Sequence, residues 1–395
     1  MSLRWLTLPR LVALFILILT GAGFQKYLMG SINNYLMFSK PFHNLLLNKS
    51  IYGLHPDLYN DNYKYSPTFA WLMGPFYYAP IGVGVFFWNL INSVVLAFGI
   101  WYYLEGEDDA ARKRWIALLI IFPEALVTAQ NMQSNNLIVG AMLLGLYHLR
   151  GERVWQAAFF FVLCGFVKFY GMAAALFFVF YPKKPQFLLA MTVWTIVFAL
   201  APATLIPLDN LLSEYQEWFR VVMVSTLGRL VSVMGLLEVW FGMAKTDANL
   251  RVVEAIGMVL FLLPFLRFRL WKDGLFQRRM IAYFLVFIII FNKMAESPTY
   301  VLAVTGVALW WLTLESPTRL DWTLLLTVIV FTSLSPTDIF PRFIRNEFFV
   351  PYRIKAVGCV LVWVKLQWEL WTQPVDSQIK ITSSSTSAPI SRLMS

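Results

Sequence analysis

Residues 81–104 read IGVGVFFWNLINSVVLAFGIWYYL and contain no charged side chain. An α-helix needs about 20 consecutive apolar residues to cross the hydrocarbon core of a bilayer, so this stretch predicts a membrane-spanning helix. Similar runs extend from Leu11 to Tyr27 and from Phe187 to Leu205. Of the 395 residues, 59% are hydrophobic and 14% are charged, and the mean hydropathy is +0.63. Soluble domains carry about 25% charged residues, so the sequence predicts a polytopic membrane protein.

Apolar runs continue along nearly the whole chain and predict an all-α bundle of about 11–13 transmembrane helices. In this interpretation residues 1–372 form a single transmembrane domain, and the Ser/Thr-rich residues 373–395 form a flexible cytoplasmic tail. Residues 67–80 and 230–244 are apolar but short, which is typical of re-entrant or interfacial segments. The expected spans are 11–29, 82–104, 115–130, 136–150, 153–168, 170–182, 187–206, 252–270, 278–291, 298–314, 319–334 and 354–371.

Lysine and arginine side chains gather in one set of loops. Cytoplasmic loops carry an excess of these residues, so this set predicts the cytoplasmic face and places both termini there. In a bacterium the protein would lie in the inner membrane, with its other face in the periplasm. These loops and the lipid headgroups account for the net charge of +10 without a nucleic-acid partner. The residues are Arg4, Arg10, Arg112, Lys113, Arg114, Arg150, Arg153, Lys183, Lys184, Arg267, Arg269, Lys272, Arg278 and Arg279.

Amide, carboxylate and proline residues gather in the other set of loops. The charge of the basic loops places this set on the extracytoplasmic face, where its first member is residues 30–66. The two cysteines and three histidines of the chain are scattered and provide no metal-binding spacing, so we expect no metal and no cofactor. The other extracytoplasmic stretches are 130–136, 207–229, 291–298 and 335–353.

Lys168 lies at the end of a predicted span, in the stretch CGFVKFYG (164–171). Ionisable groups at membrane depth are costly and usually face a cavity or a partner. The Lys168 ammonium could bind a phosphate, or it could extend to the lipid headgroups. A backbone break at Gly171 would suit a helix end that opens on a cavity. Glu296 could likewise be a loop carboxylate or, with Lys293, part of a site.

Two further groups of side chains on this face each have two interpretations. Arg342, Arg345 and Arg353 could hold lipid headgroups, or they could hold the phosphate of a lipid-linked substrate. Five amides lie within QNMQSNN (130–136). They could cap a helical hairpin, or they could donate hydrogen bonds to sugar hydroxyls.

The order of these features resembles glycosyltransferase family 87, a group of GT-C type membrane enzymes. The resemblance extends from about residue 11 to 370. Its most specific pieces are YKYSPTFAWLMGPFYYAP (63–80), QSNNLIVGAMLLGLYHLRGE (133–152), FVKFYGMAAALFFVFYP (166–182) and FNKMAESPTYVLAVTGVALWW (291–311).

The resemblance implies a GT-C-like fold with an extracytoplasmic catalytic face. It also implies that the protein transfers a sugar, most often mannose, from a polyprenyl-phosphate donor to a lipid-linked or glycan acceptor. Such transfer inverts the anomeric centre and uses no nucleotide sugar. It needs a base on the acceptor hydroxyl and cationic groups that stabilise the leaving phosphate.

The sequence departs from the family pattern at the expected catalytic aspartate. Counting back from Tyr52 by the family spacing leads to Asn34, and an amide cannot act as a general base. Asp61 is the nearest replacement, followed by Asp57 and Glu296. Tyr59, Tyr63 and Tyr65 could pack on sugar faces. The expected substrate-binding residues are Asn33, Asn34, Lys64, Tyr65, Gln133, Asn135, Asn136, Lys168, Lys293, Arg342, Arg345 and Arg353.

Two other functions fit the same polar face. A transporter or flippase of lipid-linked sugars would use the same phosphate and amide contacts without a base. Such proteins often contain inverted repeats, and the sequence contains no convincing repeat. The asparagine at position 34 would also fit a catalytically inactive assembly partner.

Overall fold

The computed structural model describes residues 7–223 and 230–375, and most of these residues are helical, with no strand among them. Four helical segments within these ranges are long and apolar enough to cross a membrane. They are α1 (Leu8–Leu28), α6 (Ile81–Tyr103), α10 (Lys184–Leu200) with its extension to Thr204, and α13 (Asp247–Leu262) with its extension to Leu266. The predicted class, an all-α polytopic membrane protein, is confirmed.

The other predicted spans are helical as well, although they are shorter or interrupted. Residues 319–334 combine α16 (Arg319–Thr327) with a π-helical turn, and residues 169–180 form the 3₁₀ helix η2 (Phe169–Phe180). A 3₁₀ helix rises about 2.0 Å per residue, so η2 extends about as far as the longer α9 beside it. The remaining ones are α7 (Ala110–Gln130), α8 (Asn135–Arg150), α9 (Val154–Val167), α14 (Gly274–Ile290), α15 (Tyr300–Trp311) and α18 (Ile354–Thr372).

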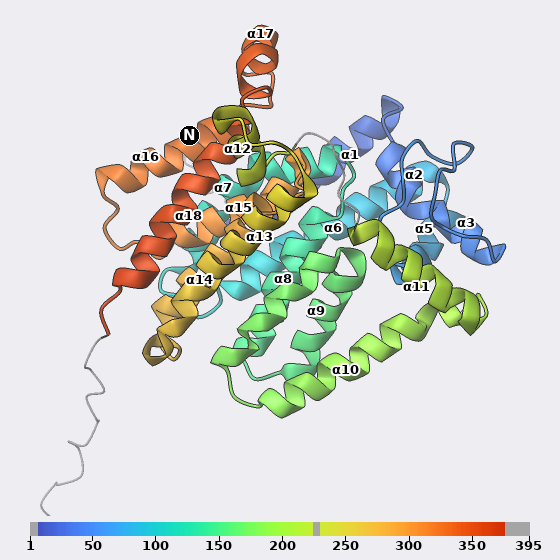
Figure 1. Ribbon diagram of the computed structural model, residues 1–395, viewed down its shortest axis with the longest axis horizontal. Coiled ribbons are helices and arrows are strands. Elements are labelled where there is room, and N and C mark those ends of the chain that lie inside the picture. The colour runs from blue at the N-terminus through green and yellow to red at the C-terminus, as the bar shows by residue number, and fades with distance from the viewer. Residues whose placement is uncertain (1–6, 224–229, 376–395) are drawn as a thin grey trace, which may run out of the picture.

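Several short helices lie in segments that the sequence assigns to loops and interfaces (Figure 1). The amphipathic α11 (Leu208–Met223) occupies most of loop 207–229, whose residues 224–229 lie outside the described residues. Much of the predicted tail, residues 376–395, lies outside them too. The short helices are α2 (Asn33–Ser39), α3 (Pro41–Leu46), α4 (Pro67–Leu72), α5 (Gly74–Tyr78), α12 (Val233–Phe241) and α17 (Arg342–Ile344).

The aromatic side chains of the first loop are part of the main hydrophobic core of the protein. Phe38 of α2 packs edge-on against Tyr65 and Phe69, with ring centroids 5.0 and 5.5 Å away. Tyr59 and Tyr63 are buried inside the loop. The rings of Tyr59 and Tyr63 therefore hold the loop together and do not present a face to a sugar.

Helices α6 and α8 touch through two glycines, which fixes the position of the amide-rich turn before α8. A Cβ atom on Gly99 would lie 2.4 Å from the carbonyl oxygen of Gly140, and one on Gly140 would lie 2.3 Å from that of Val95. Small residues allow such close backbone approach between helices in membranes. The Asn92 side chain of α6 also accepts a hydrogen bond from the backbone N–H of Leu137 (3.1 Å).

We expect Gly140→Ala to destabilise the protein and Gly21→Ala to leave it unchanged or slightly stabilised. An added methyl group at Gly140 collides with backbone, which costs about 1–3 kcal/mol. At Gly21 of α1 it meets nothing within 4 Å, while alanine gains up to about 1 kcal/mol in helix propensity. Thermal unfolding of the two purified variants measures the difference. Equal melting temperatures would contradict the close contact between α6 and α8.

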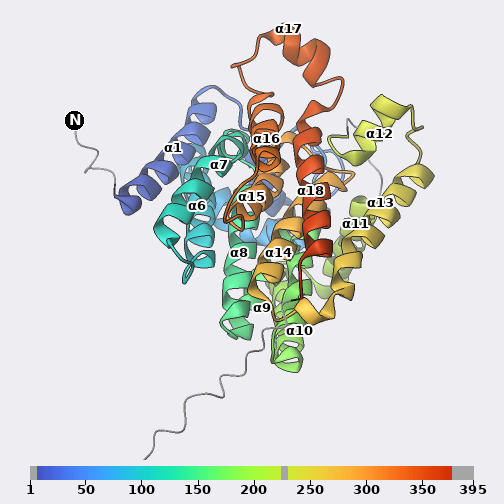
Figure 2. The same cartoon turned by 90° about the vertical axis from the view of Figure 1, so that its left-hand side faces the viewer.

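The loops form two groups at opposite ends of the bundle. At one end Glu107 pairs with Lys113 (2.9 Å) and Arg278 (3.0 Å), and Lys183 pairs with Glu152 (2.9 Å). The amide-rich loops meet at the other end, through contacts described below. Figure 2 shows α17 projecting from this second end, with α10 near the first. The basic loops and the amide-rich loops therefore lie at different ends of the bundle.

Candidate active site

Five side chains from three segments form a polar cluster at the amide-rich end. They are Tyr65, Gln133, Asn135, Lys168 and Tyr170. Lys168 Nζ donates to Asn135 Oδ1 at 2.7 Å, and the Tyr170 hydroxyl donates to the same oxygen at 3.5 Å. The Tyr65 hydroxyl donates to Gln133 Oε1 at 3.5 Å, and its ring centroid lies 5.8 Å from Lys168 Nζ. The first loop, the α7–α8 turn and the end of α9 thus converge on one site.

The break between α9 and η2 places Lys168 in this cluster. Lys168 adopts an extended backbone conformation (φ −141°, ψ 122°) directly after the last residue of α9. The chain then turns back along α9, and Gly171 lies so close to it that a Cβ atom would be 2.6 Å from the Cys164 carbonyl oxygen. The expected break therefore begins at Lys168, and the glycine at 171 allows the close return.

The side chains of the amide-rich turn have two different roles, one in the fold and one in the polar cluster. Asn136 Nδ2 donates to the Ala125 carbonyl (3.1 Å), which braces α8 against α7. Asn135 points its oxygen at Lys168 instead, and its Nδ2 is buried without a hydrogen-bond partner within residues 7–223 and 230–375. Leaving a buried donor unpaired costs about 1–3 kcal/mol. The hydrogen-bonding capacity of this amide nitrogen is therefore unused in the structure.

Two exposed carboxylates border the cluster, Asp61 and Glu296. Burial raises the pKa of Tyr65 well above its ordinary value, and the negative charges of Glu296 and Asp61 raise it further. Glu296 is also close enough to Lys168 for their charges to interact. Asp61 Oδ1 accepts a hydrogen bond from the following Asn62 N–H (2.7 Å), so the side chain also orders its own turn. Asp57 is exposed and makes no contact with the cluster within the described ranges.

A family model for glycosyltransferase family 87 matches residues 63–336. The chain belongs to glycosyltransferase family 87. All five residues of the polar cluster and Glu296 lie inside the matched segment, whereas Asp61 precedes it by two residues. No match to a curated protein was found. Family 87 membership, with the apolar helices, identifies the protein as a membrane glycosyltransferase.

The side chains of Asn33 and Asn34 stabilise the first loop of this glycosyltransferase through hydrogen bonds. Asn33 Oδ1 accepts a hydrogen bond from the Asn60 N–H (2.8 Å), and Asn34 Nδ2 donates to the Asn131 carbonyl (2.8 Å). The family resemblance leads us to expect an aspartate at position 34. The asparagine found there instead connects the first loop to the α7–α8 turn. Lys64 is half-buried and makes no hydrogen bond among the residues that the structure describes.

The remaining cationic candidates lie outside the polar cluster. Lys293 Nζ donates to the Met223 carbonyl at the end of α11 (3.4 Å). Arg345 pairs with Asp338 (2.7 Å), and Arg353 Nη1 donates to the Val350 carbonyl (2.9 Å). Arg342 is exposed on α17. Figure 2 shows α17, which begins at Arg342, projecting from the bundle, whereas Arg353 directly precedes α18. The contacts of Arg345 and Arg353 are local.

A buried ion pair was not expected from the sequence. Glu124 of α7 and Lys355 of α18 are 0% and 9% exposed at the side chain, and Lys355 Nζ lies 2.6 Å from Glu124 Oε1. The same nitrogen donates to the Thr332 carbonyl (3.0 Å) and lies 5.1 Å from the ring centroid of Tyr300. The signal was present, because both residues are ionisable groups inside predicted spans. Tyr170 was also missed, although it follows Lys168 by two positions.

Proposed function

We propose that this glycosyltransferase moves a hexose, with mannose as the first candidate, from a polyprenyl-phosphate donor to a lipid-linked or glycan acceptor. Transfer would occur on the extracytoplasmic face and invert the anomeric centre. The observation that supports this proposal is the polar cluster. It combines one ammonium group with amide and phenol side chains and is bordered by two exposed carboxylates.

Lys168 would hold the donor phosphate and stabilise the charge that develops on it. The acceptor hydroxyl oxygen attacks the anomeric carbon from the opposite side of the sugar, and the bond from that carbon to the phosphate oxygen breaks. The acceptor proton moves to a carboxylate, and the polyprenyl phosphate leaves. The buried amide nitrogen of Asn135 is a suitable additional donor to a phosphate or sugar oxygen.

We assign the role of general base to Asp61 and a sugar-binding role to Glu296. The base must lie across the sugar from the leaving group. The charge of Glu296 acts on both Lys168 and Tyr65, whereas the charge of Asp61 acts on Tyr65 and not on Lys168. This difference favours Asp61 as the group farther from the phosphate contact. The Glu296 carboxylate would accept hydrogen bonds from sugar hydroxyls.

We expect Asp61→Asn to lower the transfer rate about a hundredfold, because a general base contributes about 10²–10⁴-fold to such reactions. Asparagine keeps an oxygen that can accept from the Asn62 N–H, so the turn is preserved. Asp57→Asn in the same loop is the matched control and should be unaffected. The assay follows radiolabelled hexose from polyprenyl phosphate in purified, lipid-reconstituted protein.

The donor itself provides the test of the proposed function. Wild-type protein should transfer hexose from polyprenyl phosphate and not from a nucleotide sugar. If the protein transfers hexose from the nucleotide sugar and not from polyprenyl phosphate, the proposed donor is refuted. Movement of the intact lipid-linked sugar across vesicle membranes without transfer would support the transporter interpretation instead.

A further inference from the structure

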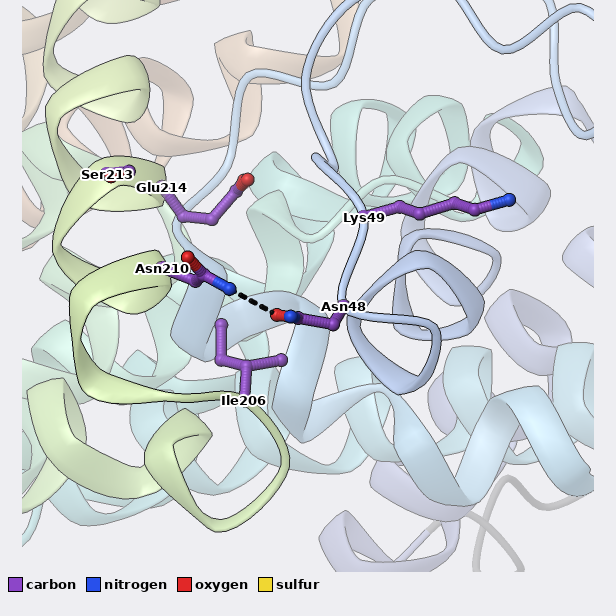
Figure 3. Close-up of a pocket in the computed structure, with 6 residues that line it drawn as sticks. All are labelled: Asn48, Lys49, Ile206, Asn210, Ser213 and Glu214. Atoms are coloured by element: carbon purple, nitrogen blue, oxygen red, sulfur yellow. Dashed lines mark hydrogen bonds between the residues drawn. The ribbon is translucent and has the colours of Figure 1, made fainter.

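A second polar pocket lies beside α11, apart from the polar cluster (Figure 3). Its volume is about 180 Å³, and Asn210 Nδ2 donates to Asn48 Oδ1 across it at 2.9 Å. Residues 48–49 of the first loop form one wall, and one face of α11 forms the other. The lining residues are Asn48, Lys49, Ile206, Asn210, Ser213 and Glu214.

The lining side chains suit an uncharged ligand rich in hydroxyl groups. The two amides can each donate and accept hydrogen bonds, as sugar hydroxyls do. The Ser213 hydroxyl donates to the Asp209 carbonyl (3.1 Å) and can still accept a hydrogen bond. The carboxylate of Glu214 opposes an anionic ligand, and the Lys49 side chain extends away from the other lining residues (Figure 3). Ile206 adds an apolar surface on which the C–H face of a sugar ring can pack.

The size of the pocket fits one monosaccharide. At about 180 Å³, the pocket has room for several water molecules and hence for a polar group of the size of one sugar ring.

Glu214 connects this pocket to the loop that carries Asp61. Its residue is 9% exposed, and its Oε2 accepts a hydrogen bond from the Ile51 N–H (3.2 Å). The next residue, Tyr52, donates through its hydroxyl to the Tyr65 carbonyl (2.8 Å). Tyr65 belongs to the polar cluster, so one loop forms part of both sites.

We infer that the pocket formed by Asn48, Asn210, Ser213 and Glu214 binds one uncharged sugar unit of the glycan acceptor. This inference rests on the proposed function for the identity of the ligand as part of an acceptor. A sugar held here extends the acceptor's contact with the protein beyond the hydroxyl that reacts. The pocket then determines which acceptors bind and leaves the chemical step to the polar cluster.

The test is binding of methyl glycosides of mannose, glucose and galactose to full-length protein, measured by saturation-transfer NMR. Ser213→Leu fills the pocket, and Asn210→Ala removes its central amide. Gln216→Ala is the matched control, because Gln216 is exposed on the same helix and does not line the pocket. We expect at least one glycoside to bind the wild type and the control, with about tenfold weaker binding to both pocket variants.

The inference is overturned if no glycoside binds the wild type, or if binding is unchanged in both pocket variants. Binding lost in Asn135→Ala but kept in Ser213→Leu would place the sugar in the polar cluster and would also overturn it. The NMR measurement needs no donor, so it remains informative if the protein fails to transfer sugar. Where transfer occurs, the pocket variants should raise the acceptor KM about tenfold and leave kcat unchanged.

Discussion

Lys168→Ala should lower the rate of sugar transfer by about 10²–10³-fold, the usual effect of removing one group that stabilises transition-state charge. The ammonium is the cationic group in direct contact with Asn135 in the polar cluster. Lys183→Ala should have little effect, because Lys183 forms an exposed ion pair with Glu152 at the opposite end of the bundle. The measurement is kcat and donor KM for both variants in the polyprenyl-phosphate assay.

Lys168→Gln separates the charge from the hydrogen bond. Glutamine can still donate to Asn135 Oδ1 but carries no charge, so we expect it to lose nearly as much activity as alanine. Thermal unfolding of each variant shows whether the fold is intact. Equal and mild losses in Lys168→Gln and Lys183→Ala would show that the charge of Lys168 does not contribute to transfer.

Lys355→Ala should destabilise the folded protein by about 3–5 kcal/mol. The substitution leaves the Glu124 carboxylate buried without its cation, because that side chain is 0% exposed. Replacing both partners, as in Glu124→Leu with Lys355→Met, should restore most of the stability, since an apolar pair of similar size avoids the buried charge. Thermal unfolding, followed by tryptophan fluorescence, measures the stability of the wild type, Lys355→Ala and the double variant.

Lys183→Ala again provides the control for Lys355→Ala. The Lys183–Glu152 pair is about half exposed, and exposed pairs contribute about 0–1 kcal/mol. If Lys355→Ala melts at the same temperature as Lys183→Ala, the Glu124–Lys355 pair does not hold α18 against α7.

The spans could be predicted from the sequence because backbone groups within a bilayer must be paired inside the helix itself. Residues 82–104 were expected to span the membrane, and α6 covers Ile81–Tyr103. Hydropathy does not distinguish an α-helix from a 3₁₀ helix, so the geometry of η2 could not be predicted. Helices α2 and α3 have seven and six residues. Their sequences are too short for a periodic signal, and contacts such as Phe38 with Phe69 stabilise them.

The candidate site was predicted in part. Lys168, Asn135 and Tyr65 lie together, as loop charge and the family resemblance suggested. The structural roles of Asn33 and Asn34 depend on partners 27 and 97 residues away in sequence, and no local pattern indicates them. The pocket beside α11 was missed for the same reason, because its two walls come from segments far apart in the chain.

The three arginines of segment 335–353 show the limit of reasoning from topology alone. Residues on one face of a membrane protein share a compartment, but they need not share a site. Arg342 begins the projecting α17 and Arg345 begins the π-helix that follows it, whereas Arg353 directly precedes α18. Local contacts of Arg345 to Asp338 and of Arg353 to the Val350 carbonyl hold these two side chains outside the cluster.

The most direct test of the proposed site is an electron cryomicroscopy structure of the protein with a bound polyprenyl-phosphate hexose. The phosphate should lie within hydrogen-bonding distance of Lys168 Nζ, roughly 2.7–3.2 Å. Asp61 should be the nearest carboxylate on the opposite side of the sugar. A phosphate bound by Arg342 and Arg345, or at the basic end near Arg278, would contradict the assignment of the polar cluster as the active site.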